Sequence, residues 1–160
     1  MHLYFVRHGL AHWPAWPGND AERPLNRDGQ LIMEAAAQGL SRRAVRPELI
    51  LHSPLLRARQ TAEIIAAALD CTERLREHHL LEPGFNPKAL RDLLREHESA
   101  ARLMFVGHAP DMGEVVAHLT GHAAKFKEGT VAHVKVKEPE KKHLKGKLEW
   151  LATADELAGE

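Results

Sequence analysis

The chain contains two apolar runs that each lead into a histidine, Phe5-Val6-Arg7-His8-Gly9 and Met104-Phe105-Val106-Gly107-His108. Both runs are typical of buried strands that stop at the end of a sheet. In an open α/β sheet, ligands bind in the crevice outside the carboxyl ends of the parallel strands. We therefore expect two histidines that are far apart in the sequence to face one ligand. The arginine directly before His8 indicates that this ligand carries phosphate.

The composition limits the size and the partners of the protein. Its 160 residues and 17.9 kDa suffice for one domain with a hydrophobic core and are short for two, so we expect a single domain over residues 1–160. Basic and acidic residues balance at 22 each, so the net charge predicts no nucleic-acid partner and no anionic membrane surface. Any cationic site must therefore be local.

The cysteine content and the N-terminal residues indicate a compartment. Cys71 is the only cysteine, which excludes an internal disulfide and fits a reducing environment. The N-terminus has no basic start followed by a long apolar stretch, and no apolar run approaches the roughly 20 residues that span a bilayer. The sequence therefore predicts a cytoplasmic protein that is neither secreted nor inserted in a membrane.

Strand-like and helix-like segments alternate along most of the chain. Short apolar runs predict three central strands, over residues 2–6, 49–52 and 103–107. Four helices are expected, at about residues 27–41, 54–69, 87–98 and 110–121. Asn26 and Ser53 precede the first two helices and are expected to cap them. The alternation predicts a three-layer α/β/α domain with a mostly parallel central sheet.

The C-terminal part has a different pattern. Residues 131–136 alternate apolar and polar side chains, residues 146–151 do so more loosely, and a lysine-rich segment joins them. This pattern predicts two antiparallel strands at the edge of the sheet, where lysines commonly prevent pairing with another chain. The lysines could also form a nucleic-acid patch, but acidic residues interrupt them and no aromatic residues alternate with them. We therefore favour a solvated hairpin.

Three strand ends are expected to bring two arginines and two histidines together. Arg7 and His8 end the first strand, and the following glycine lets the backbone turn sharply and approach a ligand. Arg57 lies in the first turn of the helix after the second strand, and His108 ends the third strand. Helix N-termini favour anions, and arginine binds phosphate oxygens in pairs. The Arg-His-Gly triplet alone is weak evidence, because a solvent-facing strand end explains it equally well.

Four motifs in this order resemble those of the histidine phosphatase superfamily, which has the phosphoglycerate mutase-like fold. The matching segments are Arg7-His8-Gly9, Arg23-Pro24-Leu25-Asn26-Arg27-Asp28-Gly29, Ser53 to Ala62, and Gly107-His108. The resemblance covers nearly the whole chain. The short length, without large insertions between strands, is similar to the SixA-type phosphohistidine phosphatases of this superfamily. The resemblance implies a hydrolase that requires no metal and no other cofactor.

The resemblance also implies a role for each motif residue. His8 is the nucleophile that becomes phosphorylated, and Arg7, Arg57 and His108 surround the transferred phosphoryl group. Such an arrangement stabilises the charge that spreads over the phosphoryl oxygens in the transition state. Attack requires a neutral ring nitrogen on His8, so we expect the other nitrogen to donate to a carbonyl or carboxylate. Water would then hydrolyse the phosphohistidine, which makes the enzyme a phosphatase.

An acid that protonates an alkoxide leaving group is the remaining part of such a site. Glu82 is our candidate, because it lies in the loop where the superfamily's donor often lies, although a surface glutamate explains it equally well. Asp111 is a second candidate that a position in the first turn of a helix also explains. Imidazole leaves more easily than an alkoxide once its distal nitrogen is protonated. A site without a strong acid would therefore favour phosphohistidine over sugar or serine phosphates.

Two further groups of residues have structural explanations. His118 and His122 have helical spacing, but no glutamate follows the first of them as in zinc proteases, so we do not expect a metal site. Trp13 and Trp16 could shape access to the pocket, although we slightly favour burial against the core.

Three functions stay open on the sequence. It favours a phosphatase of phosphohistidine in proteins, whose partner is a phosphorylated protein. A phosphatase of small phosphorylated metabolites, such as a sugar phosphate or a nucleotide, would be favoured if Glu82 lies over the pocket and the pocket mouth is lined by groups that can hold a sugar or a nucleotide. A non-catalytic phosphate-binding module is disfavoured, because His8, His108 and both arginines are all present.

Overall fold

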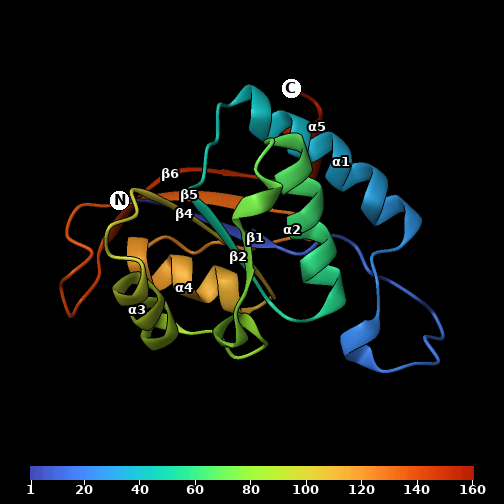
Figure 1. Cartoon of the computed structure of the whole chain (residues 1–160), viewed down its shortest axis with the longest axis horizontal. Helices are drawn as coiled ribbons and strands as arrows, with labels where there is room; N and C mark the ends of the chain where they lie inside the picture. Colours follow the sequence, from blue (N-terminus) through green and yellow to red (C-terminus); the bar gives the residue numbers. More distant parts are fainter.

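A six-stranded sheet runs through the centre of the molecule in the order β3-β2-β4-β1-β5-β6 (Figure 1). The computed structural model describes residues 1–160. The strands are β1 (His2–Arg7), β2 (Leu49–His52), β3 (Leu75–Glu77), β4 (Arg102–Gly107), β5 (Val131–Val136) and β6 (Gly146–Ala152). The first four strands are parallel, whereas β5 pairs antiparallel with β1, and β6 antiparallel with β5. The mostly parallel sheet is thus confirmed.

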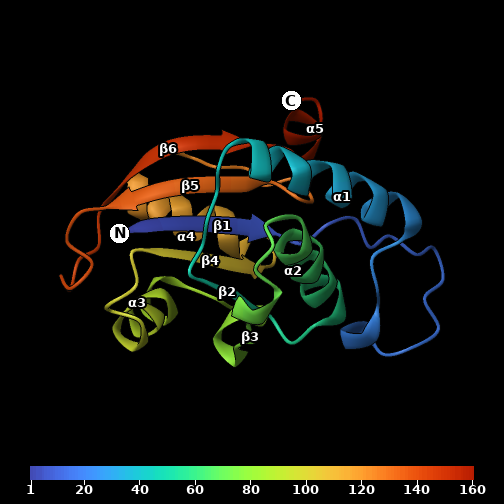
Figure 2. The same ribbon diagram turned by 45° about the horizontal axis from the view of Figure 1, so that its top comes forward.

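Five helices cover both faces of the sheet (Figure 2). They are α1 (Arg27–Arg42), α2 (Leu56–Ala68), α3 (Pro87–Glu96), α4 (Asp111–Thr120) and α5 (Ala154–Ala158). Residues of α1, α2 and α5 share one buried cluster with one face of the sheet, and residues of α3 and α4 share another with the opposite face. This is the predicted three-layer arrangement. No helix is both long and apolar enough to cross a bilayer.

β1 illustrates why the central strands are apolar between their ends. Leu3 and Phe5 belong to the cluster under α3 and α4, whereas Tyr4 and Val6 belong to the cluster under α1 and α2. Both faces of the strand are therefore removed from water between its ends, and the polar residues His2 and Arg7 lie at the half-buried ends. β1 and β4 pair in register over their full length, so their carboxyl ends reach the same edge of the sheet.

The predicted helices are present, but the start of α2 differs from the prediction. Asn26 caps α1, and its side chain accepts a hydrogen bond from Gly29 N at 2.7 Å. Ser53 does not cap α2, which begins at Leu56 with Leu55 as its N-cap and no side-chain cap. Instead the Ser53 hydroxyl accepts from Leu55 N at 3.2 Å and contacts His108. The prediction was wrong because the helix begins three residues after Ser53, and the hydroxyl accepts from a residue that precedes the helix.

The predicted C-terminal hairpin forms, but only one of its strands lies at an edge. β5 lies between β1 and β6, so the edge strands are β6 and β3. Neither β3 nor α5 was predicted from the sequence. The latter is short and starts with a capping box, in which Thr153 and Glu156 each accept from the other's backbone N–H.

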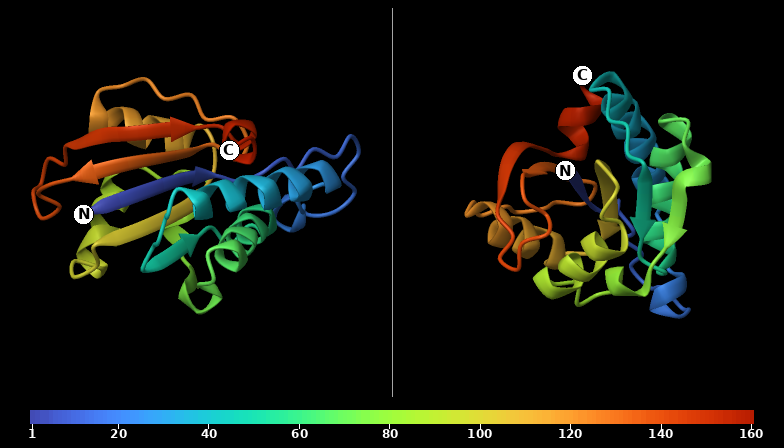
Figure 3. Two further views of the ribbon diagram at one scale, coloured as in Figure 1. Left: turned by 90° about the horizontal axis from the view of Figure 1, so that it is seen from above. Right: turned by 60° about the vertical axis from the view of Figure 1, so that its left-hand side comes forward.

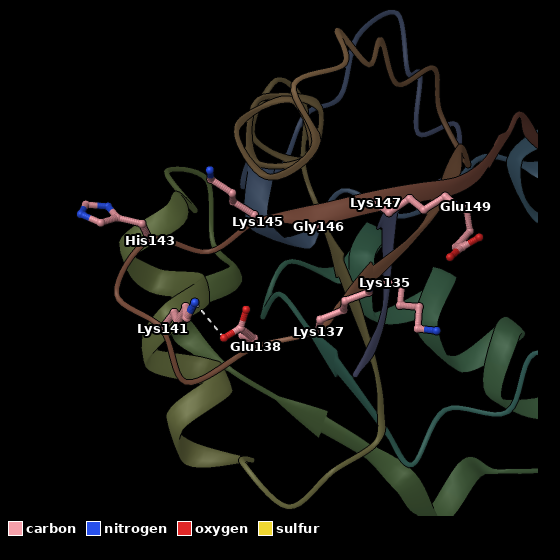
Figure 4. A pocket seen from close by; sticks show the side chains of 9 residues that line it. All are labelled: Lys135, Lys137, Glu138, Lys141, His143, Lys145, Gly146, Lys147 and Glu149. Atoms are coloured by element: carbon pink, nitrogen blue, oxygen red, sulfur yellow. Dashed lines mark ion pairs between the residues drawn. The ribbon is translucent and has the colours of Figure 1, made fainter.

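The lysines of this hairpin surround a hollow of about 690 Å³ (Figure 4). It lies far from the carboxyl end of β1, because Lys135 pairs with the first residue of that strand. Lys135 and Lys147 oppose each other across β5 and β6, which like charges disfavour. Lys141 pairs with Glu138 at 2.8 Å, and Lys145 and Lys135 point in opposite directions. Exposed lysines that diverge in this way support a solvated hairpin.

Candidate active site

The carboxyl ends of β1, β2 and β4 meet at one edge of the sheet, as the sequence predicts, and a pocket of about 520 Å³ opens there. The structure brings four of the five predicted site residues to this place, either from a strand end or from the helix that follows. The residues that line the pocket are Arg7, His8, Leu10, Ala11, His12, Arg23, Arg57, Pro83, His108, Ala109 and Glu128.

The ring of His8 is oriented by the backbone of the next residue. His8 is 8% exposed, and its Nδ1 lies 2.7 Å from the carbonyl oxygen of Gly9. Because a carbonyl oxygen can only accept, Nδ1 carries the proton and Nε2 has the free lone pair. This is the hydrogen bond expected for a nucleophilic imidazole. The backbone of His8 is itself anchored, since its N–H donates to Gly107 O at 2.9 Å.

Thr61 joins two segments of the site, a role that the sequence analysis did not predict. Its buried hydroxyl accepts from Gly9 N at 3.0 Å and donates to Arg57 O at 2.8 Å. The turn after β1 is thereby tied to α2. Gly9 allows α1 to approach closely, because an added Cβ would lie 2.6 Å from Cγ of Met33.

The two predicted arginines each have a carboxylate partner and one buried donor without a partner. Nη1 of Arg7 donates to Phe126 O at 2.9 Å and lies 3.1 Å from Oε1 of Glu128. Nη1 of Arg57 donates to the carbonyl of Asp20 at 3.0 Å, and its Nη2 lies 3.2 Å from Oδ2 of that residue. The Nε atoms of both arginines are buried and have no hydrogen-bond partner. A buried donor without a partner costs folding free energy, and a bound anion can supply the missing acceptor. Both guanidinium groups are therefore suited to bind an anion.

His108 is held by Ser53. Its Nε2 lies 2.8 Å from the Ser53 hydroxyl, and both residues are buried. The ring centroids of His108 and His8 are 5.3 Å apart, with 60° between the ring planes. The end of β2 therefore positions a side chain from the end of β4, next to the ring from the end of β1.

Burial keeps both imidazoles neutral. It lowers the pKa of His8 to about 3, with the charges of Arg57 and Arg7 acting in the same direction and the Gly9 hydrogen bond opposing them. Burial also lowers the pKa of His108 to about 4, helped by the nearby Arg57. The pKa of the Arg57 guanidinium is lowered by burial as well, although Asp20 opposes this. His8 is thus available as a base or nucleophile over the whole range around neutrality.

The two candidate acids lie outside the pocket lining. Glu82 is exposed and lines a neighbouring hollow, whereas the next residue, Pro83, lines the pocket. Oδ2 of Asp111 accepts from Gly84 N at 2.8 Å, so this carboxylate holds the loop that contains Glu82. A contact with the reacting groups is seen for neither of them, and the proton-donor role of Glu82 stays a prediction.

Three charged residues near the pocket were not selected as site residues from the sequence. Glu128 and Arg23 line it, and Asp20 lies beside it in a short 3₁₀ helix, η1 (Asp20–Glu22). Nε of Arg23 donates to Oδ1 of Asp20 at 3.1 Å, so this carboxylate bridges Arg23 and Arg57. Arg23 is part of a segment that matches the family, which could have identified it. Asp20 and Glu128 belong to no motif.

The two tryptophans stabilise the loop that carries Asp20 and Arg23. Trp13 is 40% exposed, and its ring contacts that of Trp16 at 5.7 Å between centroids. Trp13 Nε1 donates to Pro24 O at 2.9 Å, and Trp16 Nε1 donates to Asn19 O at 3.0 Å. Burial against the core was the wrong interpretation, because Trp13 is exposed and the contacts of both rings are within the loop. Figure 3 shows this loop extending away from the sheet.

Comparisons with known proteins agree with this geometry. The sequence profile of the histidine phosphatase superfamily (branch 1) matches residues 3–138. An uncharacterised protein of Picosynechococcus sp. is 40% identical over 141 residues, 82% of each chain. The phosphohistidine phosphatase SixA of Escherichia coli is 30% identical over 121 residues, 74% of each chain. A solved structure of the protein histidine phosphatase SixA with tungstate is 27% identical, with a TM-score of 0.86 over 98% of this chain and 99% of that one. The chain therefore belongs to the histidine phosphatase superfamily and has its phosphoglycerate mutase-like α/β fold.

Proposed function

We propose that the protein is a phosphohistidine phosphatase that acts through a covalent phosphohistidine on His8. The observation that carries the proposal is the His8 ring, whose Nδ1 is bound to Gly9 O and whose neutral Nε2 lies in a pocket with two arginines. Arg7 and Arg57 each offer a buried Nε–H that has no partner within the protein. Phosphoryl oxygens are strong acceptors for such donors. The likeness to SixA supports the same substrate.

In the first step, Nε2 of His8 attacks the phosphorus atom of the substrate phosphohistidine. A P–N bond to His8 forms as the P–N bond of the substrate breaks, and the electron pair stays on the substrate imidazole. That imidazole leaves as a neutral ring, because its other nitrogen carries a proton. Arg7 and Arg57 hold the phosphoryl oxygens as charge spreads over them, and His108 completes the polar surroundings.

In the second step, water attacks the phosphorus atom of the phosphoenzyme. The P–N bond to His8 breaks, its electron pair returns to Nε2, and both protons of the water molecule leave with the inorganic phosphate that is released. The Gly9 carbonyl keeps the proton on Nδ1 throughout, so the ring starts each cycle in the same tautomer.

The carboxylates around the pocket favour phosphohistidine over phosphate esters. An alkoxide leaving group needs a proton donor within hydrogen-bond reach. Glu82 is not part of the pocket lining, Glu128 is paired with Arg7, and Asp20 is paired with Arg23 and Arg57. A protonated imidazole leaves without such a donor. The position of Glu82 in a neighbouring hollow supports phosphohistidine as the substrate rather than a small phosphorylated metabolite.

We further infer that the phosphorylated substrate is a protein, and that residues 1–160 act as one domain in the cytoplasm. All strands belong to one sheet, which supports the single domain. The cytoplasmic location is supported by the single cysteine, Cys71, which is buried and free.

The test compares phosphate release from a phosphohistidine protein, a phosphoserine peptide and a sugar phosphate. We expect hydrolysis of the first substrate, complete loss of it in His8→Ala, and an acid-labile phosphoryl group on His8 when turnover is quenched. His12→Ala, which changes an exposed histidine of the same pocket, should keep most of the activity. Preference for the sugar phosphate would replace the proposal with a metabolite phosphatase. Turnover that does not depend on His8 would refute it.

A further inference from the structure

A second pocket adjoins the candidate active site. It has a volume of about 580 Å³ and shares Arg7 and Ala109 with the first pocket. One side is formed by α4, and the other by the segment 123–126, which follows the turn after that helix. We refer to this second pocket as the α4 groove. Figure 3 shows the chain after α4 turning back along the helix.

The α4 groove differs in chemistry from the pocket that contains His8. Small and apolar side chains dominate its lining, among them Ala117 on the helix and Ala123, Ala124 and Phe126 on the opposite side. It also contains one acidic side chain, Glu114, and two basic ones, Lys125 and the shared Arg7. A surface of this kind suits an apolar chain segment with polar groups along it, whereas the cationic pocket suits the phosphoryl group.

The width of the α4 groove is set by close packing at its base. Gly113 lies where α4 meets the 123–126 segment, and a Cβ on this residue would be 2.4 Å from the Ala124 carbonyl oxygen. The segment is also tied to the active site, because Phe126 O accepts from Nη1 of Arg7 at 2.9 Å. The α4 groove is therefore built into the fold and is held in a fixed position relative to Arg7, which is proposed to hold the phosphoryl group.

We propose that the α4 groove binds the polypeptide segment next to the phosphorylated histidine of the substrate. This inference rests on the proposed function and deepens it, because it explains how a protein substrate is distinguished from a small phosphoramidate. A small phosphorylated metabolite that fills the pocket containing His8 has no further part that could occupy the α4 groove. Contacts made by a remote part of a substrate can be used to orient its reacting group, so the segment increases kcat/KM.

Ala123→Trp tests the proposal, because it places a large side chain on an exposed position of the α4 groove. The matched control is His122→Trp, one residue earlier, which is exposed and does not line the groove. The two substrates are phosphoimidazole and a peptide in which alanine and leucine residues flank one phosphohistidine. With Ala123→Trp we expect kcat/KM for the peptide to fall about tenfold or more, and that for phosphoimidazole to stay within about twofold. His122→Trp should change neither.

The two substrates separate the two possible failures. If the wild type hydrolyses both substrates and Ala123→Trp leaves their ratio of kcat/KM unchanged, the α4 groove does not bind the substrate and the inference is wrong. An equal loss on both substrates would overturn it in the same way. If the wild type hydrolyses neither the peptide nor phosphoimidazole, the proposed function fails, and the inference that rests on it fails too. Ala117→Leu, on the opposite side of the groove, is expected to act in the same direction as Ala123→Trp.

Discussion

The Asp20 carboxylate forms an ion pair with Arg57 at the pocket, with 3.2 Å between Oδ2 and Nη2. The same carboxylate also accepts from Nε of Arg23 at 3.1 Å. Its negative charge therefore lies beside the groups that are proposed to bind the phosphoryl oxygens. An incoming phosphoryl dianion meets electrostatic repulsion from Asp20 and competes with it for the Arg57 guanidinium.

We predict that Asp20→Asn binds phosphate and tungstate more tightly than the wild type. The Asp20 side chain is 67% exposed, so solvent screens the interaction and the gain in affinity is expected to be about fivefold at most. Inhibition constants for the two anions measure the effect. Glu22→Gln is the control, because Glu22 lies in the same 3₁₀ helix and makes no ion pair with the pocket arginines. Weaker binding in Asp20→Asn would mean that Asp20 mainly positions Arg57.

Arg57→Lys separates the shape of the guanidinium group from its charge. The guanidinium group binds Asp20 through two nitrogens and keeps Nε as a further buried donor. Lysine retains the charge but lacks the planar set of donors, so we expect kcat/KM for phosphohistidine to fall about a hundredfold. Steady-state kinetics with the phosphohistidine protein test this. Arg59→Lys, two residues further along α2 and exposed, should leave the rate unchanged. A fall of less than threefold would indicate that only the charge matters.

The sequence could predict the parts of the fold that are buried on both sides. β1, β2 and β4 are continuous apolar runs because helices cover both faces of the sheet, and their ends locate His8 and His108. β3 could not be predicted in this way. It has only three residues, two of them exposed, and it forms because its backbone pairs with β2 at the edge of the sheet.

The site residues that could be predicted from the sequence are those in motifs at the end of a strand or the start of a helix. Arg7 and Arg57 are examples, and the pocket contains both. Asp20 and Glu128 were not predictable, because loops that approach only in the folded chain bring them to these arginines. Ser53 was identified but interpreted wrongly. A capping position and a contact with His108 use the same hydroxyl, and the sequence does not distinguish them.

We predict that Ser53→Ala lowers both stability and activity. The substitution removes the partner of His108 Nε2 and leaves a buried polar atom unpaired, which costs about 1–3 kcal/mol of unfolding free energy. Because the His108 ring is then less well held, kcat should fall while KM changes less. Urea unfolding and kinetics on the same preparation measure the two effects. Ser41→Ala, near the end of α1 and outside the pocket, is the control. Unchanged stability would show that the hydroxyl is not needed to satisfy His108.

The low pKa values of His8 and His108 predict how stability depends on pH. In the unfolded chain both residues titrate near 6.5, whereas in the folded protein their pKa values are about 3 and about 4. Below pH 6.5 the unfolded state therefore binds more protons than the native state, and the unfolding free energy falls as the pH is lowered toward 4. Each histidine contributes up to about 1.4 kcal/mol per pH unit in this range. The contribution is fully present only above pH 6.5.

Urea unfolding at several pH values between 7.5 and 4.5 tests this pH dependence in the wild type and in His8→Asn. The variant lacks one of the two titrating groups. As the pH falls, we therefore expect its unfolding free energy to decline less steeply than that of the wild type, and the two slopes should differ by the uptake of one proton. His122→Asn, which changes an exposed histidine, should keep the wild-type slope. Identical slopes for the wild type and His8→Asn would mean that His8 takes up its proton equally in the folded and unfolded chains. A neutral imidazole enforced by burial, on which the nucleophilic role depends, would then be ruled out.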